Sequence, residues 1–137
     1  DLGAGWGFLT RSIYTSHNPS HIALYELDHN ALDAAMRNCA ELDQSKLSFH
    51  WHDVTKQPIT TRYDHVVMNP PFHRGKSTQA SLGQMFIEQA YRILRERGTL
   101  CLVANRHLPY ENLLKERFKA VEMVADHNGF KVLRAVR

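Results

Sequence analysis

The stretch DLGAGWG, residues 1–7, places three glycines at alternate positions. Glycine lets a backbone turn sharply and approach a ligand closely, and a helix starting near residue 7 would direct its positive amino end at the same point. Nicotinamide dinucleotide loops have the spacing GxGxxG, but position 8 holds Phe8, so the spacing here is GxGxG. The stretch predicts a ligand-binding turn from a strand into a helix, with a purely structural turn as the alternative.

Short apolar runs recur along the rest of the chain and are predicted to be strands. They occupy residues 21–26, 47–52, 64–68 and 99–104. Segments with helical spacing separate them, and this alternation is typical of parallel strands joined by helices. We therefore expect an α/β fold with a Rossmann-like, doubly wound and mostly parallel sheet.

Two of the intervening segments carry their apolar side chains on one helical face. Between the first two predicted strands these residues are Leu32, Ala35, Met36 and Cys39. Within residues 79–96 they are Leu82, Phe86, Ala90 and Ile93. This spacing gives a helix one apolar stripe, so both helices should pack on the sheet.

The two ends of the chain carry different predictions. Apolar residues 119–125 and 130–136 flank Asn128-Gly129, a pair that favours the positive φ angles of a tight turn, so the chain should close with an antiparallel hairpin. A GxGxG turn usually follows a central strand, and none precedes Asp1. We expect that strand to be missing, so that residues 1–137 form one catalytic domain truncated at its amino end, without an upstream domain.

Composition excludes few functions. The 137 residues are 43% hydrophobic with a net charge of +3, enough apolar content for one core and a basicity compatible with a nucleic-acid partner without establishing one. Cys39 and Cys101 stand outside any CxxC spacing and are expected to be free thiols. No apolar run reaches the ~18 residues of a membrane span, so we expect a cytoplasmic protein with no membrane partner.

Two acids end or follow the strands nearest the glycine-rich turn. Glu26 ends the run 21–26, where its carboxylate can accept both hydroxyls of a ribose. Asp53 follows the run 47–52, where it can meet the amino group of an adenine. The alternatives are an exposed strand-end acid for Glu26 and a helix cap or solvated acid for Asp53.

Taken in order, these motifs resemble those of a known family. Asp1, the three glycines, Glu26, Asp53 and the NPPF of residues 69–72 resemble the motif series of class I S-adenosylmethionine-dependent methyltransferases. Over nearly the whole chain, NPPFH at 69–73, VAN at 103–105, LPY at 108–110 and FKVLRA at 130–135 are similar to the catalytic half of ribosomal RNA guanine-N2 methyltransferases of the RsmC and RlmG type.

The resemblance implies a class I methyltransferase fold and an enzyme that methylates guanine N2 in ribosomal RNA, of the small subunit in preference to the large. Ribosomal RNA or a ribosomal subunit would be its partner. In that family a degenerate methyltransferase-like domain usually precedes the catalytic one. S-adenosylmethionine would be the cofactor, bound by Asp1, Gly3, Gly5, Gly7, Glu26, Asp53 and Asn69.

The NPPF segment suits the chemistry of amine methylation. An exocyclic amine gains positive charge as it accepts a methyl group, so hydrogen-bond acceptors stabilise the transition state more than the ground state. Asn69 offers a side-chain oxygen and Pro70 a carbonyl, and the prolines hold both in place. Phe72 offers a ring on which a base can stack. We predict catalytic roles for Asn69, Pro70 and Phe72, with a plain Asn-Pro turn as the alternative.

Residues around this motif are candidates for binding RNA. They are Pro71, Phe72, His73, Arg74, Lys76 and Arg106. The three cations could each hold a phosphate, or could be solvated surface groups; His73 could contact the base or be an ordinary surface group. His50 and His52 share one strand face, but a third ligand at useful spacing is absent, so we expect no metal.

Two other functions stay open. The same chemistry could act on another planar amine, adenine N6 or a protein glutamine, although His73, LPY and the tail favour guanine. The chain could instead be a non-catalytic RNA-binding module with a decayed cofactor site. The presence of Gly3, Gly5, Glu26 and Asn69 argues against decay.

Overall fold

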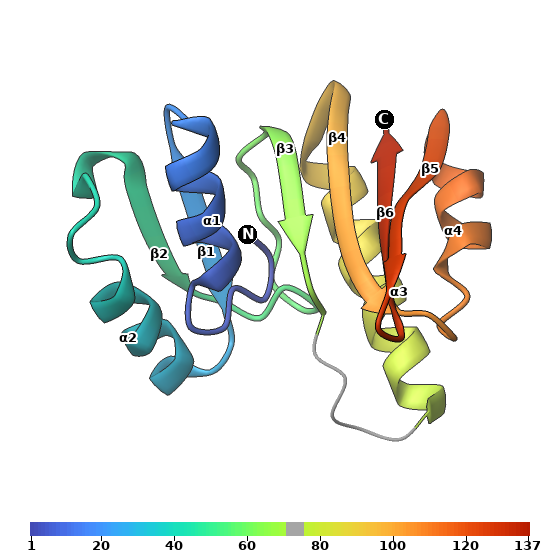
Figure 1. Cartoon of the computed structure of the whole chain (residues 1–137), viewed down its shortest axis with the longest axis horizontal. Helices are drawn as coiled ribbons and strands as arrows, with labels where there is room; N and C mark the ends of the chain where they lie inside the picture. The colour runs from blue at the N-terminus through green and yellow to red at the C-terminus, as the bar shows by residue number, and fades with distance from the viewer. Residues whose placement is uncertain (71–75) are drawn as a thin grey trace. The chain divides into compact units, whose positions relative to one another are not determined.

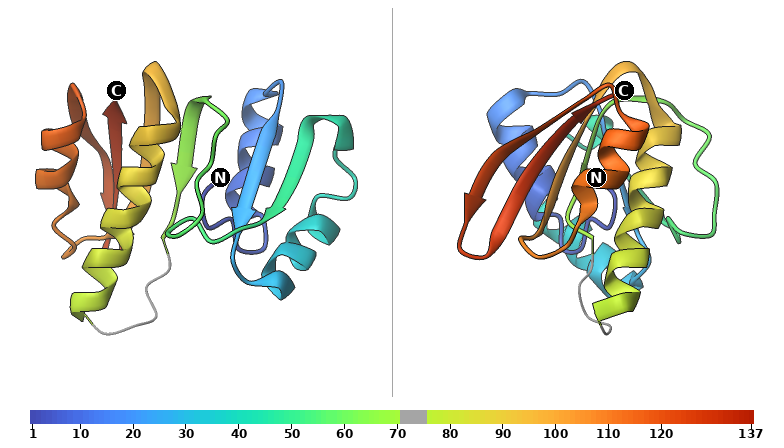
Figure 2. Two further views of the ribbon diagram at one scale, coloured as in Figure 1. Left: turned by 180° about the vertical axis from the view of Figure 1, so that it is seen from behind. Right: turned by 90° about the vertical axis from the view of Figure 1, so that its right-hand side faces the viewer.

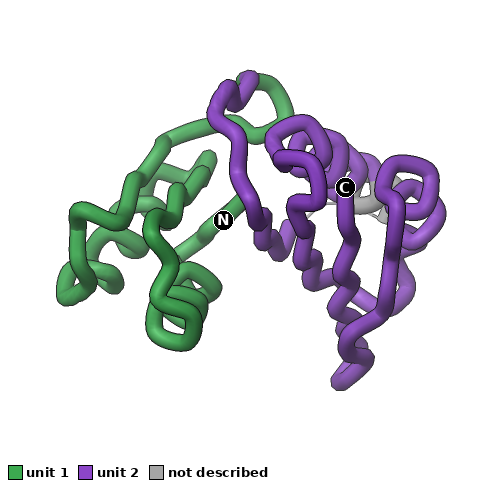
Figure 3. The backbone as a smooth tube through the Cα atoms, turned by 90° about the horizontal axis from the view of Figure 1, so that it is seen from above, with its two compact units in different colours: residues 1–57 green, residues 58–137 purple. Residues whose placement is uncertain are grey.

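The computed structural model describes the backbone of residues 1–70 and 76–137 and the side chains of residues 1–70 and 81–137. The chain divides into two compact units, Asp1–Gln57 and Pro58–Arg137 (Figure 3). Within the described residues, no helix is both long enough and apolar enough to cross a membrane.

Unit 1 is a pair of parallel strands with two helices. Its elements in order are α1 (Phe8–His17), β1 (Ile22–Glu26), α2 (His29–Asn38), the 3-10 helix η1 (Gln44–Lys46) and β2 (Leu47–Trp51) (Figure 1). Ile22 pairs with Leu47 and Glu26 with Trp51. Both predicted strands are confirmed, and their apolar side chains share one core with Ala35 of α2, with Cys39 directly after it, and with Ile13 and Tyr14 of α1.

Helix α2 confirms the predicted amphipathic helix with one exception. Its first turn is capped by the Asp28 carboxylate, which accepts hydrogen bonds from the backbone N–H groups of Asn30 and Ala31. Leu32, Ala35 and Cys39 are buried. Met36 is 41% exposed, so the prediction that it packs on the sheet is wrong. A narrow pair of strands covers only the stripe through positions 32, 35 and 39, and position 36 lies at its margin.

Unit 2 is a four-stranded sheet with both helices on one face (Figure 2). Its elements are β3 (Tyr63–Met68), α3 (Lys76–Ile93), β4 (Leu94–Asn105), α4 (Tyr110–Arg117), β5 (Ala120–His127) and β6 (Phe130–Val136). The strand order is β3-β4-β6-β5, with β3 parallel to β4 and the other pairs antiparallel. The mixture of parallel pairs and a closing hairpin is the one predicted.

The hairpin turn follows from its sequence. Asn128 and Gly129 have φ angles of 50° and 79°, both positive, as a two-residue hairpin turn requires.

At the other end of the sheet, β4 begins earlier than predicted. Tyr63 pairs with Leu94 and His65 with Thr99, so residues 95–98 bulge out of the ladder. Consequently α3 ends at Ile93, before the predicted 96.

The contact between α3 and α4 is close. In α3, Phe86, Ala90 and Ile93 are buried as predicted. Gly83 lies against Tyr110, the first residue of α4, and a Cβ atom on Gly83 would stand 1.9 Å from the Tyr110 hydroxyl oxygen. Only glycine allows this packing. This explains why a residue of low helix propensity stands in the middle of α3.

Gly83→Ala is predicted to destabilise the chain although alanine favours helix by about 1 kcal/mol. Overpacking against the buried Tyr110 ring should lower the free energy of unfolding by about 1 to 3 kcal/mol, measured by urea denaturation. Gln84→Ala, at an exposed position of the same helix, is the matched control and should change it by less than about 0.5 kcal/mol. A gain in stability from Gly83→Ala would show that α4 moves aside freely.

Candidate functional site

The glycine-rich turn starts alongside β1. The Asp1 nitrogen donates to the Ala23 carbonyl, Tyr25 N–H to the Asp1 carbonyl at 2.9 Å, and Gly3 N–H to the Tyr25 carbonyl at 2.8 Å. This alternation is that of a parallel ladder, and the chain then enters α1 directly after Gly7. The predicted turn into a helix is confirmed, and Leu2 before it forms an isolated parallel bridge with Tyr25. Binding of a ligand by the turn stays a prediction.

Gly5 and Glu26 meet in this turn. Gly5 N–H donates to Glu26 Oε2 at 2.8 Å, and Asp28 N–H donates to Oε1 at the same distance. Gly5 has a φ angle of 55°, and a Cβ atom there would meet no heavy atom within 4 Å. A carboxylate has about four acceptor positions, so Glu26 can hold the loop and still accept bonds from a ligand. The backbone at Gly5 thus faces open space beside a carboxylate.

Gly7 has a packing role instead. Its φ angle is 86°, and a Cβ atom would lie 3.2 Å from Ala35 Cβ and 3.4 Å from Cys39 Sγ. The glycine therefore lets the start of α1 approach α2. Burial raises the pKa of the Cys39 thiol, which suits an inert core group. Binding of a cofactor by Gly7 stays a prediction.

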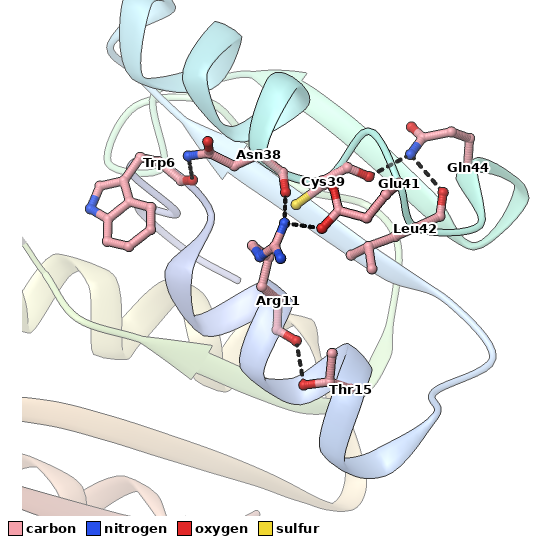
Figure 4. Close-up of polar contacts among 8 residues, drawn as sticks. All are labelled: Trp6, Arg11, Thr15, Asn38, Cys39, Glu41, Leu42 and Gln44. Carbon is pink, nitrogen blue, oxygen red and sulfur yellow. Dashed lines mark hydrogen bonds and ion pairs between the residues drawn. The ribbon is translucent and has the colours of Figure 1, made fainter.

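The end of α2 fastens the loop from the other side (Figure 4). Asn38 Nδ2 donates to the Trp6 carbonyl at 2.9 Å. The Arg11 guanidinium donates to the Asn38 carbonyl and pairs with Glu41 at 2.5 Å. Sequence reasoning missed Asn38 and Arg11; a polar residue at the last position of an amphipathic helix was the available sign. The Trp6 ring itself is 55% exposed beside Phe8.

Asp1 presents an unsatisfied oxygen to this region. The Thr10 hydroxyl donates to Asp1 Oδ2 at 2.8 Å, while Oδ1 is buried and has no hydrogen-bond partner among the residues described. A buried carboxylate oxygen without a donor is unfavourable by about 1 to 3 kcal/mol. The position therefore suits a ligand with N–H groups.

Asp53 is occupied in its own turn. Its Oδ1 accepts from Thr55 N–H at 2.9 Å and from the Thr55 hydroxyl at 2.6 Å, and Lys56 Nζ lies 3.4 Å from Oδ2. These hydrogen bonds lower the pKa of the Asp53 carboxyl, and the bond from the Thr55 hydroxyl has the largest effect. No helix follows Asp53 in the fully described segment before β3, so its carboxylate closes a local turn and is not a helix cap. Contact with an adenine stays a prediction.

His50 of β2 and His52, just after that strand, pack on one aromatic ring. His50 stacks on Tyr25 with ring centroids 4.6 Å apart, and His52 meets the same ring edge-on at 5.2 Å. Burial lowers the pKa of His50, which favours its neutral form. Across the described residues no group of three or more His, Cys, Asp or Glu side chains could hold a metal ion.

In unit 2, Asn69 and Pro70 follow Met68, the last residue of β3. Asn69 is exposed and Pro70 is buried, so the amide is available while the proline ring is anchored. Pro71, Phe72, His73 and Arg74 lie outside the described residues, as does the Lys76 side chain at the start of α3. Their predicted roles stay predictions.

Arg106, predicted to hold a phosphate, has a protein partner. It follows β4, and its Nη2 lies 2.5 Å and its Nε 2.7 Å from Asp126 Oδ1.

Sequence reasoning also missed Lys131, a buried lysine on β6 whose Nζ lies 2.5 Å from Glu111. Burial alone would raise the pKa of the Glu111 carboxyl, but the hydrogen bond and charge of Lys131, a backbone hydrogen bond and the charge of Lys115 together outweigh burial, and the pKa is lowered.

Comparison with known proteins identifies the family. Residues 1–134 match the methyltransferase small domain family. The chain belongs to this family. It is 35% identical to ribosomal RNA small subunit methyltransferase C of Cronobacter sakazakii, covering 99% of the chain and 39% of that protein. It is 36% identical to ribosomal RNA large subunit methyltransferase G of a Shewanella species, covering 100% of the chain and 37% of that protein. The chain thus spans about two fifths of these relatives.

Solved structures agree on the fold. A T. thermophilus 16S rRNA N2 methyltransferase (RsmC), in complex with AdoMet and guanosine, matches with a TM-score of 0.83 and 32% identity over 100% of this chain and 36% of that one. TrmN from Thermus thermophilus matches with a TM-score of 0.73 at 19% identity over 99% of this chain and 42% of that one. The predicted class I methyltransferase fold is confirmed.

Gly5 and Gly7 of the turn are predicted to differ in their tolerance of a side chain. Gly5→Ala should lower the free energy of unfolding by about 1 to 2 kcal/mol, the strain of a left-handed backbone alone. Gly7→Ala adds a contact with Ala35 and should be about 1 kcal/mol worse, measured by urea denaturation. Equal losses would mean that α2 does not press on Gly7.

Proposed function

We propose that the chain is the catalytic part of an S-adenosylmethionine-dependent methyltransferase that modifies the N2 amine of a guanine in ribosomal RNA, of the small subunit in preference to the large. The main support is the similarity to RsmC, whose structure with AdoMet and guanosine covers the whole of this chain. The names of the two relatives, ribosomal RNA small subunit methyltransferase C and large subunit methyltransferase G, give ribosomal RNA as their substrate. Such a substrate would place the protein in the cytoplasm.

The glycine-rich turn fits this cofactor. Asp1 Oδ1 is buried without a donor and would accept from the amino group of the methionine part. Glu26, already bound to Gly5 N–H, would accept the ribose hydroxyls with its remaining lone pairs. Open space above Gly5 leaves room for the ligand to approach the backbone. When bound, the cofactor supplies an electrophilic methyl group carried on a sulfonium.

Asn69 is the proposed catalytic acceptor. Its exposed amide directly follows β3, and its oxygen would accept a hydrogen bond from the guanine amine. That bond strengthens as the nitrogen becomes cationic, so it lowers the barrier more than it stabilises bound substrate. The Pro70 carbonyl would accept the second N–H, and its buried ring limits movement of the segment.

Inosine, which lacks the exocyclic amine, provides the test of the substrate. Small-subunit RNA transcribed with guanosine should accept labelled methyl groups, and the same RNA transcribed with inosine should not. Methylation that survives inosine would contradict guanine N2 and favour adenine N6. No methylation of any RNA by a chain that binds the cofactor would support the non-catalytic alternative.

Glu26→Ala is predicted to weaken binding of S-adenosylmethionine roughly 10- to 150-fold, because about 1.5 to 3 kcal/mol of hydrogen bonding to a charged group is lost. Isothermal titration calorimetry measures this. Glu96→Ala, an exposed acid in unit 2, is the control and should bind normally. Tight binding of NADH in place of S-adenosylmethionine would refute the cofactor assignment.

Asn69→Ala is predicted to lower the single-turnover methylation rate by about 100-fold, the effect of about 3 kcal/mol lost from the transition state. Cofactor affinity should stay near normal. Asn69→Asp keeps an acceptor and should retain more activity than Asn69→Ala. An alanine variant with unchanged turnover and only a raised KM would mean that Asn69 merely holds the substrate.

A further inference from the structure

Lys131 is the only buried lysine or arginine among the side chains that the structure describes. It is 3% exposed, and its Nζ donates to the Leu108 carbonyl at 2.6 Å and to Glu111 Oε1 at 2.5 Å. A buried ammonium group loses its hydration and is tolerated only when charged and polar partners replace the water. Both partners belong to the segment that follows β4, not to the strand that carries Lys131.

The same hairpin contacts this segment at a second place. We define the β4–α4 loop as residues 106–109. Arg106 N–H donates to the Gly129 carbonyl at 2.8 Å, and the Arg106 guanidinium pairs with Asp126. The β5–β6 hairpin thus holds the loop near its start through Arg106 and near its end through Leu108.

Topology places the loop at the same edge of the sheet as Asn69. β3 and β4 are parallel, so Asn69 and the β4–α4 loop both follow carboxyl ends of neighbouring strands. β6 runs antiparallel to β4, so its first residues, Phe130 and Lys131, pair with Asn105 and Ala104 there. In doubly wound sheets, this edge is where ligands bind.

We propose that Lys131 is a positioning residue that fixes the β4–α4 loop in the conformation that binds RNA beside Asn69. Asp126 completes this arrangement by orienting Arg106. The two nitrogens that face Asp126 leave other N–H groups of the guanidinium for a phosphate oxygen. This inference rests on the proposed function for the identity of the ligand.

Stability and position can be separated experimentally. Replacing both members of a buried ion pair by apolar residues of similar size often leaves stability unchanged, whereas it removes the directional bonds. The double variant Lys131→Met/Glu111→Leu should therefore fold normally and remove the Lys131 hydrogen bond to the Leu108 carbonyl, leaving that of the Tyr110 N–H. A merely structural role for the pair predicts normal activity in this variant.

The experiment compares the full chain, the double variant and Lys119→Met, an exposed lysine of the same unit as control. We expect hydrogen exchange at the Leu108 and Tyr110 amides to accelerate at least tenfold in the double variant only. Its kcat/KM for small-subunit RNA should fall at least tenfold, mostly through KM. Its affinity for S-adenosylmethionine should stay within twofold, because the proposed cofactor residues of the glycine turn lie in unit 1.

Unchanged exchange, or accelerated exchange with unchanged kcat/KM, would overturn the proposal. Glu111→Gln, which keeps an acceptor but loses the charge, gives the same readouts if the double variant does not fold, and should show a smaller change in the same direction. If the unaltered chain methylates no RNA, the proposed function fails, and the exchange measurement alone then decides whether Lys131 holds the loop.

Discussion

The conformation of the glycine turn in unit 1 depends on the hydrogen bonds that the Glu26 carboxylate accepts. It receives the N–H of Gly5 on one oxygen and that of Asp28 on the other, so a single side chain ties the glycine turn to the start of α2. Asp28 in turn caps α2, and the last residue of that helix, Asn38, binds the Trp6 carbonyl. The loop is therefore held at both sides, and its shape is set before any ligand arrives. Preorganisation of this kind reduces the entropy lost on binding.

In unit 2, the β5–β6 hairpin contacts the loop that follows β4. Its parallel strands β3 and β4 end at one edge, where Asn69 and the β4–α4 loop follow them. A loop at such an edge needs outside contacts to be rigid, and the antiparallel hairpin supplies them through Asp126, Gly129 and Lys131. The closing hairpin therefore completes the sheet and also forms hydrogen bonds and an ion pair with the β4–α4 loop.

The proposed chemistry divides along the same line as the fold. Residues suited to a charged, hydroxyl-rich cofactor, Asp1, Gly5 and Glu26, belong to unit 1, whereas Asn69 and Pro70, suited to an amine, belong to unit 2. The family match spans both units, so each is part of the same methyltransferase domain.

The sequence alone determined the local features of this protein. Short apolar runs predicted the strands, Asn128-Gly129 predicted the hairpin turn, and the GxGxG spacing predicted the turn into α1, because each depends on the preferences of neighbouring residues. The family resemblance followed from the order of such motifs along the chain.

Only the tertiary structure decided which partner each polar side chain takes. The apolar spacing predicts a buried Met36, which is exposed, and Arg106, still a candidate for holding a phosphate, pairs with Asp126. Asp53 caps its own turn, and the burial of Lys131 was not foreseen. Gly5 and Glu26 are 21 residues apart, and Lys131 and Leu108 are 23 apart. Contacts of this length depend on how strands and helices pack, and no spacing within a short window of sequence specifies them.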